Sequence, residues 1–160
     1  MTPIETPTTL ESKTIEKLQD LVRINQDSAK GFKDAAEVVS NEQLKRLFSD
    51  MSTRRSENAA ALMGYVENNG EDTEDAAEGS WRGQLHRWWM ELRGKLSGGD
   101  AYAVLAEAER GEDQIKAMYE EVLKETAGNA VNDVLLQQYG NVKKGHDTIR
   151  DLRDAVKAAN

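Results

Sequence analysis

Residues 101–122 read AYAVLAEAERGEDQIKAMYEEV, and this stretch decides the fold. Its inward positions recur at alternating steps of four and three residues, the spacing that places side chains on one face of an α-helix. Asp100 stands just before the stripe, where an aspartate accepts hydrogen bonds from the first turn of a helix. The stretch therefore predicts a bundle helix with a carboxylate at its middle, and its inward face comprises Ala101, Leu105, Ala108, Glu112, Ile115, Tyr119 and Val122.

The same periodicity covers most of the chain. It predicts α-helices over about residues 12–39, 41–69, 100–126 and 129–158. A composition of 38% hydrophobic and 31% charged residues with two prolines is typical of a helical bundle. Residues 1–11, rich in threonine and containing both prolines, are expected to form a flexible N-terminal arm before a single domain of residues 12–160.

The connection between the second and third helices is long. Residues 71–99 exceed a tight turn and, at about 1.5 Å per helical residue, can run the length of the bundle. Within them, residues 81–96 predict a short amphipathic helix. The fold is thus expected to be an all-α, up-down four-helix bundle with a long crossover that carries this helix. Such connectivity is typical of ferritin-like bundles.

The apolar side of the crossover helix is a candidate interaction surface, made of Trp81, Leu85, Trp88, Trp89 and Leu92. This segment carries four basic residues and one acidic residue, Glu91. The resulting positive charge would suit docking to a partner protein, a second subunit or a membrane surface. The alternative, which we favour, is that this side packs on the bundle or on its copy in a dimer. We therefore expect a homo-oligomer, with a membrane partner disfavoured and a protein partner undetermined.

The bulk composition excludes several functions. With 29 acidic and 21 basic residues the net charge is -8, so nucleic acid is not an expected partner. No cysteine is present, which excludes disulfides, thiolate metal sites and cysteine nucleophiles. No apolar run approaches the roughly 18 residues that a membrane span needs. We expect a soluble cytoplasmic protein and, because no catalytic motif occurs, a role other than catalysis.

Polar residues interrupt all four helical stripes near their middles. The middles of the helices in an antiparallel bundle lie at similar height, so these residues should converge. Burying an unpaired charge costs several kcal/mol, so such a layer persists only if its charges pair, are hydrated or bind a ligand.

Two interpretations follow for this layer. In the first, carboxylates and an imidazole bind one divalent metal, iron, manganese or zinc, and the ligands come from Glu112, His146, Glu57, Asp27 and Glu109. In the second, basic residues neutralise the carboxylates and form a buried ionic layer with Asn25, Arg54, Arg55, Asn58, Asp113 and Lys143. The number of basic residues favours the second interpretation.

The segments INQDSAKGFKDAAE (24–37), LHRWWMELRGKLSGGD (85–100), AERGEDQIKAMYEEVL (108–123) and KKGHDTIRDLRD (143–154) carry a resemblance. Together they resemble a bacterial ferritin-like four-helix-bundle family known as a domain of unknown function. The wider ferritin-like superfamily binds two metals through paired Glu-x-x-His motifs. The corresponding pairs here are Arg54 with Glu57 and Lys143 with His146, so the resemblance implies a mononuclear or degenerate dinuclear site at most.

Overall fold

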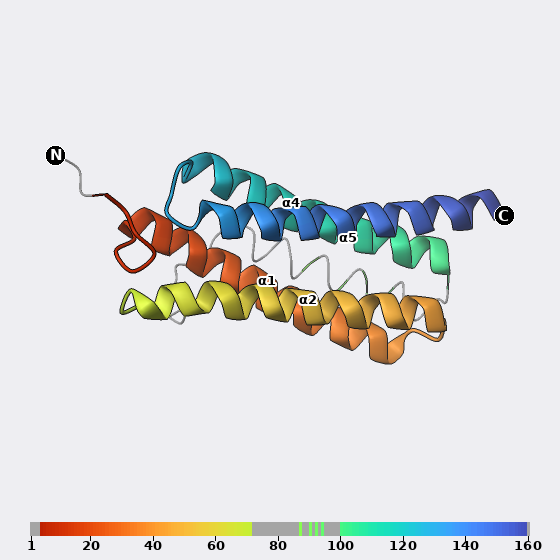
Figure 1. Ribbon diagram of the computed structural model, residues 1–160. Helices are drawn as coiled ribbons and strands as arrows, with labels where there is room; N and C mark the ends of the chain where they lie inside the picture. Colours follow the sequence, from red (N-terminus) through yellow and green to blue (C-terminus); the bar gives the residue numbers. More distant parts are fainter. Residues whose placement is uncertain are drawn as a thin grey trace.

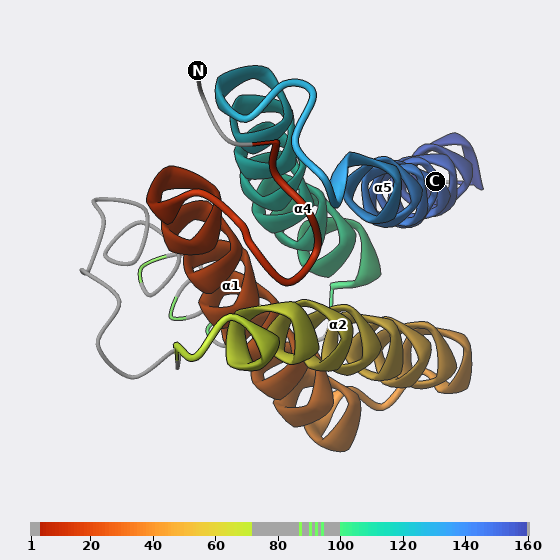
Figure 2. The same ribbon diagram turned by 60° about the vertical axis from the view of Figure 1, so that its left-hand side comes forward.

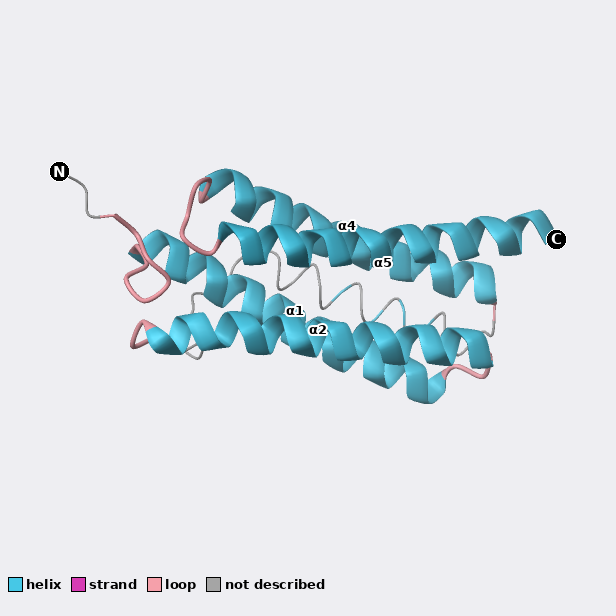
Figure 3. Cartoon of the chain, in the orientation of Figure 1, coloured by secondary structure: helices cyan, strands magenta, loops and turns pink. Residues whose placement is uncertain are grey.

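The computed structural model describes residues 4–71, 87, 90, 92, 94 and 100–159. Four long helices make up most of these residues: α1 (Ser12–Val38), α2 (Glu42–Asn68), α4 (Ala101–Glu125) and α5 (Asn132–Ala159). The described ranges contain no strand (Figure 3). The expected all-α four-helix bundle is therefore confirmed. None of the described helices is both long enough and apolar enough to cross a bilayer.

The bundle consists of two antiparallel hairpins, α1 with α2 and α4 with α5, which lie against each other (Figures 1 and 2). Lys17 Nζ near the start of α1 lies 2.9 Å from Glu125 Oε2 at the end of α4, so these two helices are antiparallel. Consequently α2 and α4 run in the same direction. The last residue of α2 and the first residue of α4, which residues 69–100 connect, therefore lie at opposite ends of the bundle. The predicted crossover helix, residues 81–96, falls mostly outside the described residues, although residues 87, 90, 92 and 94 are helical.

The apolar stripes of the four helices meet in one core. The rings of Phe32 and Phe48 pack with their centroids 5.7 Å apart, and each such buried side chain contributes about 1.5–3 kcal/mol. Leu92 is part of this core and is only 1% exposed. Its assignment to an interaction surface was therefore wrong, because packing on the bundle removes it from solvent. The other four members of the predicted surface, Trp81, Leu85, Trp88 and Trp89, lie outside the described residues.

Local sequence signals explain where the helices begin and end. Asp100 caps α4, as predicted, by accepting a hydrogen bond from the Tyr102 backbone N–H at 3.0 Å. Asn41 caps α2 through the Leu44 backbone N–H at 3.0 Å. Gly70 follows α2 and Gly128 follows α4 with φ of 77° and 79°, a left-handed conformation that favours glycine.

Residues 4–11 differ from the flexible arm that their composition suggested. They fold back over the end of the bundle near Asn69, whose Oδ1 accepts from the Leu10 backbone N–H at 2.9 Å. The Glu5 carboxylate accepts from the Ala130 backbone N–H at 2.7 Å and from the Thr14 hydroxyl at 2.9 Å. The Glu5 and Asn69 side chains supply hydrogen bonds that a count of threonines and prolines does not reveal.

Candidate functional site

A buried ion pair lies near mid-height between the two hairpins. Arg55 of α2 contacts Glu112 of α4 through Nη2 and Oε2, and the two residues are 1% and 0% exposed. From α5, Gly145 faces this pair: a β-carbon there would lie 3.6 Å from Glu112 Oε2 and 3.7 Å from Arg55 Nη2. The same β-carbon would lie 3.4 Å from Met51 Cε. Gly145 therefore faces the ion pair, and a methyl group at this position would be in ordinary van der Waals contact with it.

A chain of hydrogen bonds crosses all four helices beside this pair. Asn25 Nδ2 of α1 donates to the Tyr119 hydroxyl of α4 at 2.8 Å, and that hydroxyl donates to Gln138 Oε1 of α5 at 2.8 Å. Gln138 Nε2 then donates to the backbone carbonyl of Asn58 of α2 at 3.3 Å. All four residues are buried. The chain therefore binds the two hairpins together through directional contacts inside the apolar core.

Burial dominates the protonation chemistry of this layer. Burial raises the pKa of the Glu112 carboxyl, and the adjacent Arg55 guanidinium opposes that rise without cancelling it. Burial likewise raises the pKa of Tyr119 to about 12, although the amides of Asn25 and Asn58 act in the opposite direction. The tyrosine is consequently a neutral hydrogen-bonding group at physiological pH.

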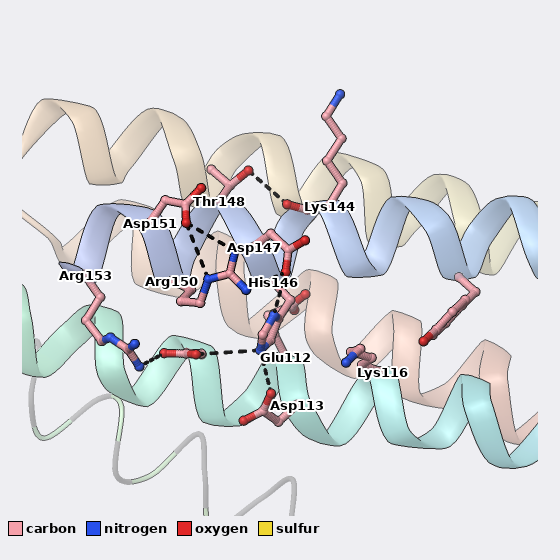
Figure 4. Close-up of polar contacts among 12 residues, drawn as sticks. Glu112, Asp113, Lys116, Lys144, His146, Asp147, Thr148, Arg150, Asp151 and Arg153 are labelled. Carbon is pink, nitrogen blue, oxygen red and sulfur yellow. Dashed lines mark hydrogen bonds and ion pairs between the residues drawn. The ribbon is translucent and has the colours of Figure 1, made fainter. Parts of the chain in front are cut away.

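His146 forms a second polar cluster nearer the surface, where α5 meets α4 (Figure 4). Its Nε2 lies 2.6 Å from Asp113 Oδ1 and 3.7 Å from Glu109 Oε1, and its Nδ1 lies 3.2 Å from Asp147 Oδ1. Glu109 also pairs with Arg153 of α5. Because the Asp113 side chain is 59% exposed, this cluster is partly solvated. It links the two helices of one hairpin rather than the two hairpins.

The predicted ionic layer is only partly buried. Asn25, Arg55 and Asn58 lie in the interior, whereas Arg54, Asp113 and Lys143 are exposed. Each exposed residue directly follows or precedes a buried one, and neighbouring residues of a helix point about 100° apart. Placing Arg54, Asp113 and Lys143 in the interior was therefore wrong.

Of the predicted metal ligands, His146 and Glu109 lie together in the cluster between α4 and α5, whereas the other three are dispersed. Glu112 is fully buried against Arg55, Glu57 is exposed, and Asp27 is half-buried on α1. Within the described ranges, no group of three or more histidine, cysteine, aspartate or glutamate side chains is arranged to hold a metal ion. A guanidinium in contact with the central carboxylate would also repel a divalent cation. In this arrangement the donor set does not fit the dinuclear centre of ferritin-like proteins.

Sequence reasoning missed the roles of Tyr119, Gln138 and Gly145. The sequence placed Tyr119 on an inward face without a role, and it did not single out Gln138 or Gly145. A signal existed for two of them: Tyr119 lies nine residues before Gly128, and Gln138 lies nine residues after Asn129 on the other side of the turn. In an antiparallel hairpin, residues equally far from the turn face each other.

Comparison with known proteins gives a family but no activity. No curated protein matches this chain. The sequence model of one protein family matches residues 13–125, which cover α2, α4 and all but the first residue of α1. Because this match covers well over half of the chain, the protein belongs to the family described as a domain of unknown function, DUF2383.

Proposed function

We propose that this chain is a ferritin-like bundle with a structural or interaction role, and that it is not an enzyme. The observation that supports this proposal is the buried pair of Arg55 and Glu112. The fully buried carboxylate already holds a permanent cation of the same chain. While that pair persists, Glu112 serves neither as a metal ligand nor as a general base.

The burial of the ion pair is a second observation that supports the proposal. A groove between α1 and α2 is lined by Lys33, Ala36, Glu37, Lys45, Ser49, Ser52 and Thr53. None of the mid-bundle polar residues lines this groove. An active site needs reactive groups that a substrate can reach, and the side chains of Arg55 and Glu112 are only 2% and 0% exposed.

The interaction role rests on the sequence of the crossover. Leu92 packs into the core, and we propose that the other four members of the predicted surface, Trp81, Leu85, Trp88 and Trp89, contact another subunit. We propose a cytoplasmic homo-oligomer in which this contact forms. The net charge of -8 supports a partner other than nucleic acid.

Metal content tests the proposal against its alternative, a metal-binding ferritin-like protein. The full chain without a tag is incubated anaerobically with Fe(II), Mn(II) or Zn(II), desalted and analysed for bound metal. We expect no near-stoichiometric retention, and the same result for His146→Ala. The physical reason is that Arg55 occupies the central carboxylate and Glu57 points to solvent.

Two variants sharpen this experiment. Arg55→Met removes the internal cation but keeps an unbranched apolar side chain, so it shows whether Arg55 alone prevents metal binding. Lys116→Met removes a cation from the 3.6 Å surface pair with Glu120 and is the matched control. Stoichiometric metal in the wild-type chain that disappears in His146→Ala would overturn the proposal in favour of a mononuclear site.

A further inference from the structure

The segment before α1 lies at one end of the bundle, where α1 and α5 both begin (Figure 2). Its Glu5 carboxylate uses both oxygens: Oε1 accepts from the Ala130 backbone N–H at 2.7 Å, and Oε2 accepts from the Glu11 backbone N–H at 2.8 Å. The buried Thr14 hydroxyl also donates to Oε2, at 2.9 Å. Because Glu11 directly precedes α1 and Ala130 lies two residues before α5, one carboxylate binds the starts of two helices from different hairpins. A negative charge is favoured there by the partial positive charge of a helix N-terminus.

Asn69, at the end of α2, binds the other side of the same segment. Its Oδ1 accepts from the Leu10 backbone N–H at 2.9 Å, and its Nδ2 donates to the Pro7 carbonyl at 2.9 Å. The Leu10 side chain is 8% exposed and belongs to the hydrophobic core. The segment is therefore attached to the end of α2 in the first hairpin as well as to the α4–α5 turn of the second.

The backbone between these two attachments is held in one shape. The Thr9 N–H donates to the Thr6 carbonyl at 3.0 Å, and the Thr6 N–H donates to the Thr9 hydroxyl at 3.1 Å, so residues 6–9 form a turn. Pro7 occupies the second position of this turn, where the fixed φ of proline is favourable. Because the turn has little freedom of its own, a displacement of Glu5 is transmitted to Leu10.

We propose that residues 5–11 form a strap that ties the two hairpins together at this end of the bundle and opens as one unit. Release of the Glu5 attachment loosens the Asn69 attachment, and the reverse, because the turn joins them. An open strap exposes the Ala130 N–H to water and uncovers the part of the core against which Leu10 packs. This inference goes beyond the proposed function, because neither metal binding nor contact between subunits enters it.

Hydrogen exchange of backbone amides in the full chain measures this opening. The Leu10 and Ala130 amides should become exchangeable in the same event, so we expect similar protection factors at these two positions. Both should exchange faster than the Phe48 amide in the interior of α2, whose side chain is 0% exposed, because the bundle stays folded when the strap opens.

Two substitutions test the coupling in opposite directions. Glutamine has one carbonyl oxygen and no charge, so Glu5→Gln weakens the attachment to Ala130 and Glu11. We expect the Leu10 amide, which is bonded to Asn69, to exchange at least about tenfold faster in this variant, since a hydrogen bond to a charged group is lost. Asn69→Ala removes the acceptor of the Leu10 amide, and we expect faster exchange at Ala130, which is bonded to Glu5.

Two further variants are matched controls. Glu16→Gln makes the same chemical change at an exposed position of α1. Asn41→Ala removes the side chain that caps α2 at the other end of the bundle, where it accepts from the Leu44 N–H. Both controls should leave the exchange of Leu10 and Ala130 unchanged, because neither side chain is part of the strap.

The responses of the two amides decide the inference. Faster exchange at Ala130 alone in Glu5→Gln, or at Leu10 alone in Asn69→Ala, would show two independent attachments and would overturn it. Equal protection of Leu10, Ala130 and Phe48 in the wild-type chain would also overturn it, because the segment would then open only when the whole bundle unfolds.

Discussion

Breaking the Arg55–Glu112 pair from one side should be among the most damaging substitutions in this protein. Glu112 is 0% exposed, and Oε1 already has no partner among the described residues. Arg55→Met therefore leaves a carboxylate with neither a counter-charge nor solvent. Removal of one partner of a buried pair costs about 3–5 kcal/mol. At about 2–4 °C per kcal/mol for a chain of this size, we expect the Tm to fall by about 6–20 °C.

A double-mutant cycle separates the pair from its individual members. Glu112→Leu leaves the guanidinium buried alone and should cost about as much as Arg55→Met. The double variant buries two apolar side chains instead, and replacement of a buried pair by apolar residues is often neutral or stabilising by about 1–4 kcal/mol. It should thus be more stable than either single variant, with a coupling of at least about 6 kcal/mol, because the two single losses of about 3 kcal/mol or more are both recovered.

Urea denaturation followed by circular dichroism measures these differences. Lys116→Met provides the control, because its partner Glu120 is half exposed and a surface pair contributes about 0.3–0.5 kcal/mol. If Arg55→Met costs no more than this control, or if the double variant loses the sum of the two single losses, the reasoning about a desolvated pair is refuted.

The same variant has a pH dependence of defined sign. Burial raises the folded-state pKa of Glu112, so the protonated carboxyl is favoured in the folded state and stability is lost as pH rises through that pKa. Arg55→Met removes the charge that opposes this rise. The stability deficit of the variant should therefore shrink between about pH 8 and about pH 5. A deficit that is constant over this range would contradict a buried carboxylate as its cause.

Two further predictions concern other hydrogen bonds. Tyr119→Phe removes the hydroxyl that joins Asn25 to Gln138, and it should lower the free energy of unfolding, measured by urea denaturation, by about 1–3 kcal/mol. Tyr139→Phe is the control: it removes an exposed hydrogen bond to Glu120 and should lower the free energy of unfolding by less than about 1 kcal/mol. For Glu5, burial raises the pKa, but the hydrogen bonds from Glu11, Ala130 and Thr14 outweigh it and lower the pKa below the usual 4.5. Its stabilisation is thus present above that value and lost as pH falls through the folded pKa. The urea midpoints of wild type and Glu5→Gln should differ at neutral pH and converge in acid, and equal midpoints at neutral pH would contradict this.

Helical periodicity predicted most of the fold, because the local sequence determines which side chains of a helix face inward. Steps of three and four residues identified the four helices, and they placed Asn25, Arg55, Asn58 and Glu112 on inward faces. The errors came from treating neighbours as though they shared a face. Arg54 and Asp113 adjoin buried residues, but the turn of the helix directs their side chains to solvent.

To predict which buried residues pair with each other, one must know how far each helix is shifted along its neighbour. Within one hairpin the turn provides it: Glu112 and Gly145 lie sixteen residues before Gly128 and sixteen after Asn129, and they meet in the structure. Between hairpins no short turn does so, because residues 69–100 separate α2 from α4. The sequence could therefore show that Arg55 and Glu112 both point inward, but not that they pair with each other. Whether Arg55 and Glu112 pair is what distinguishes an ion pair from a metal ligand at Glu112, and for this reason the same residues were compatible with both the metal interpretation and the ionic interpretation.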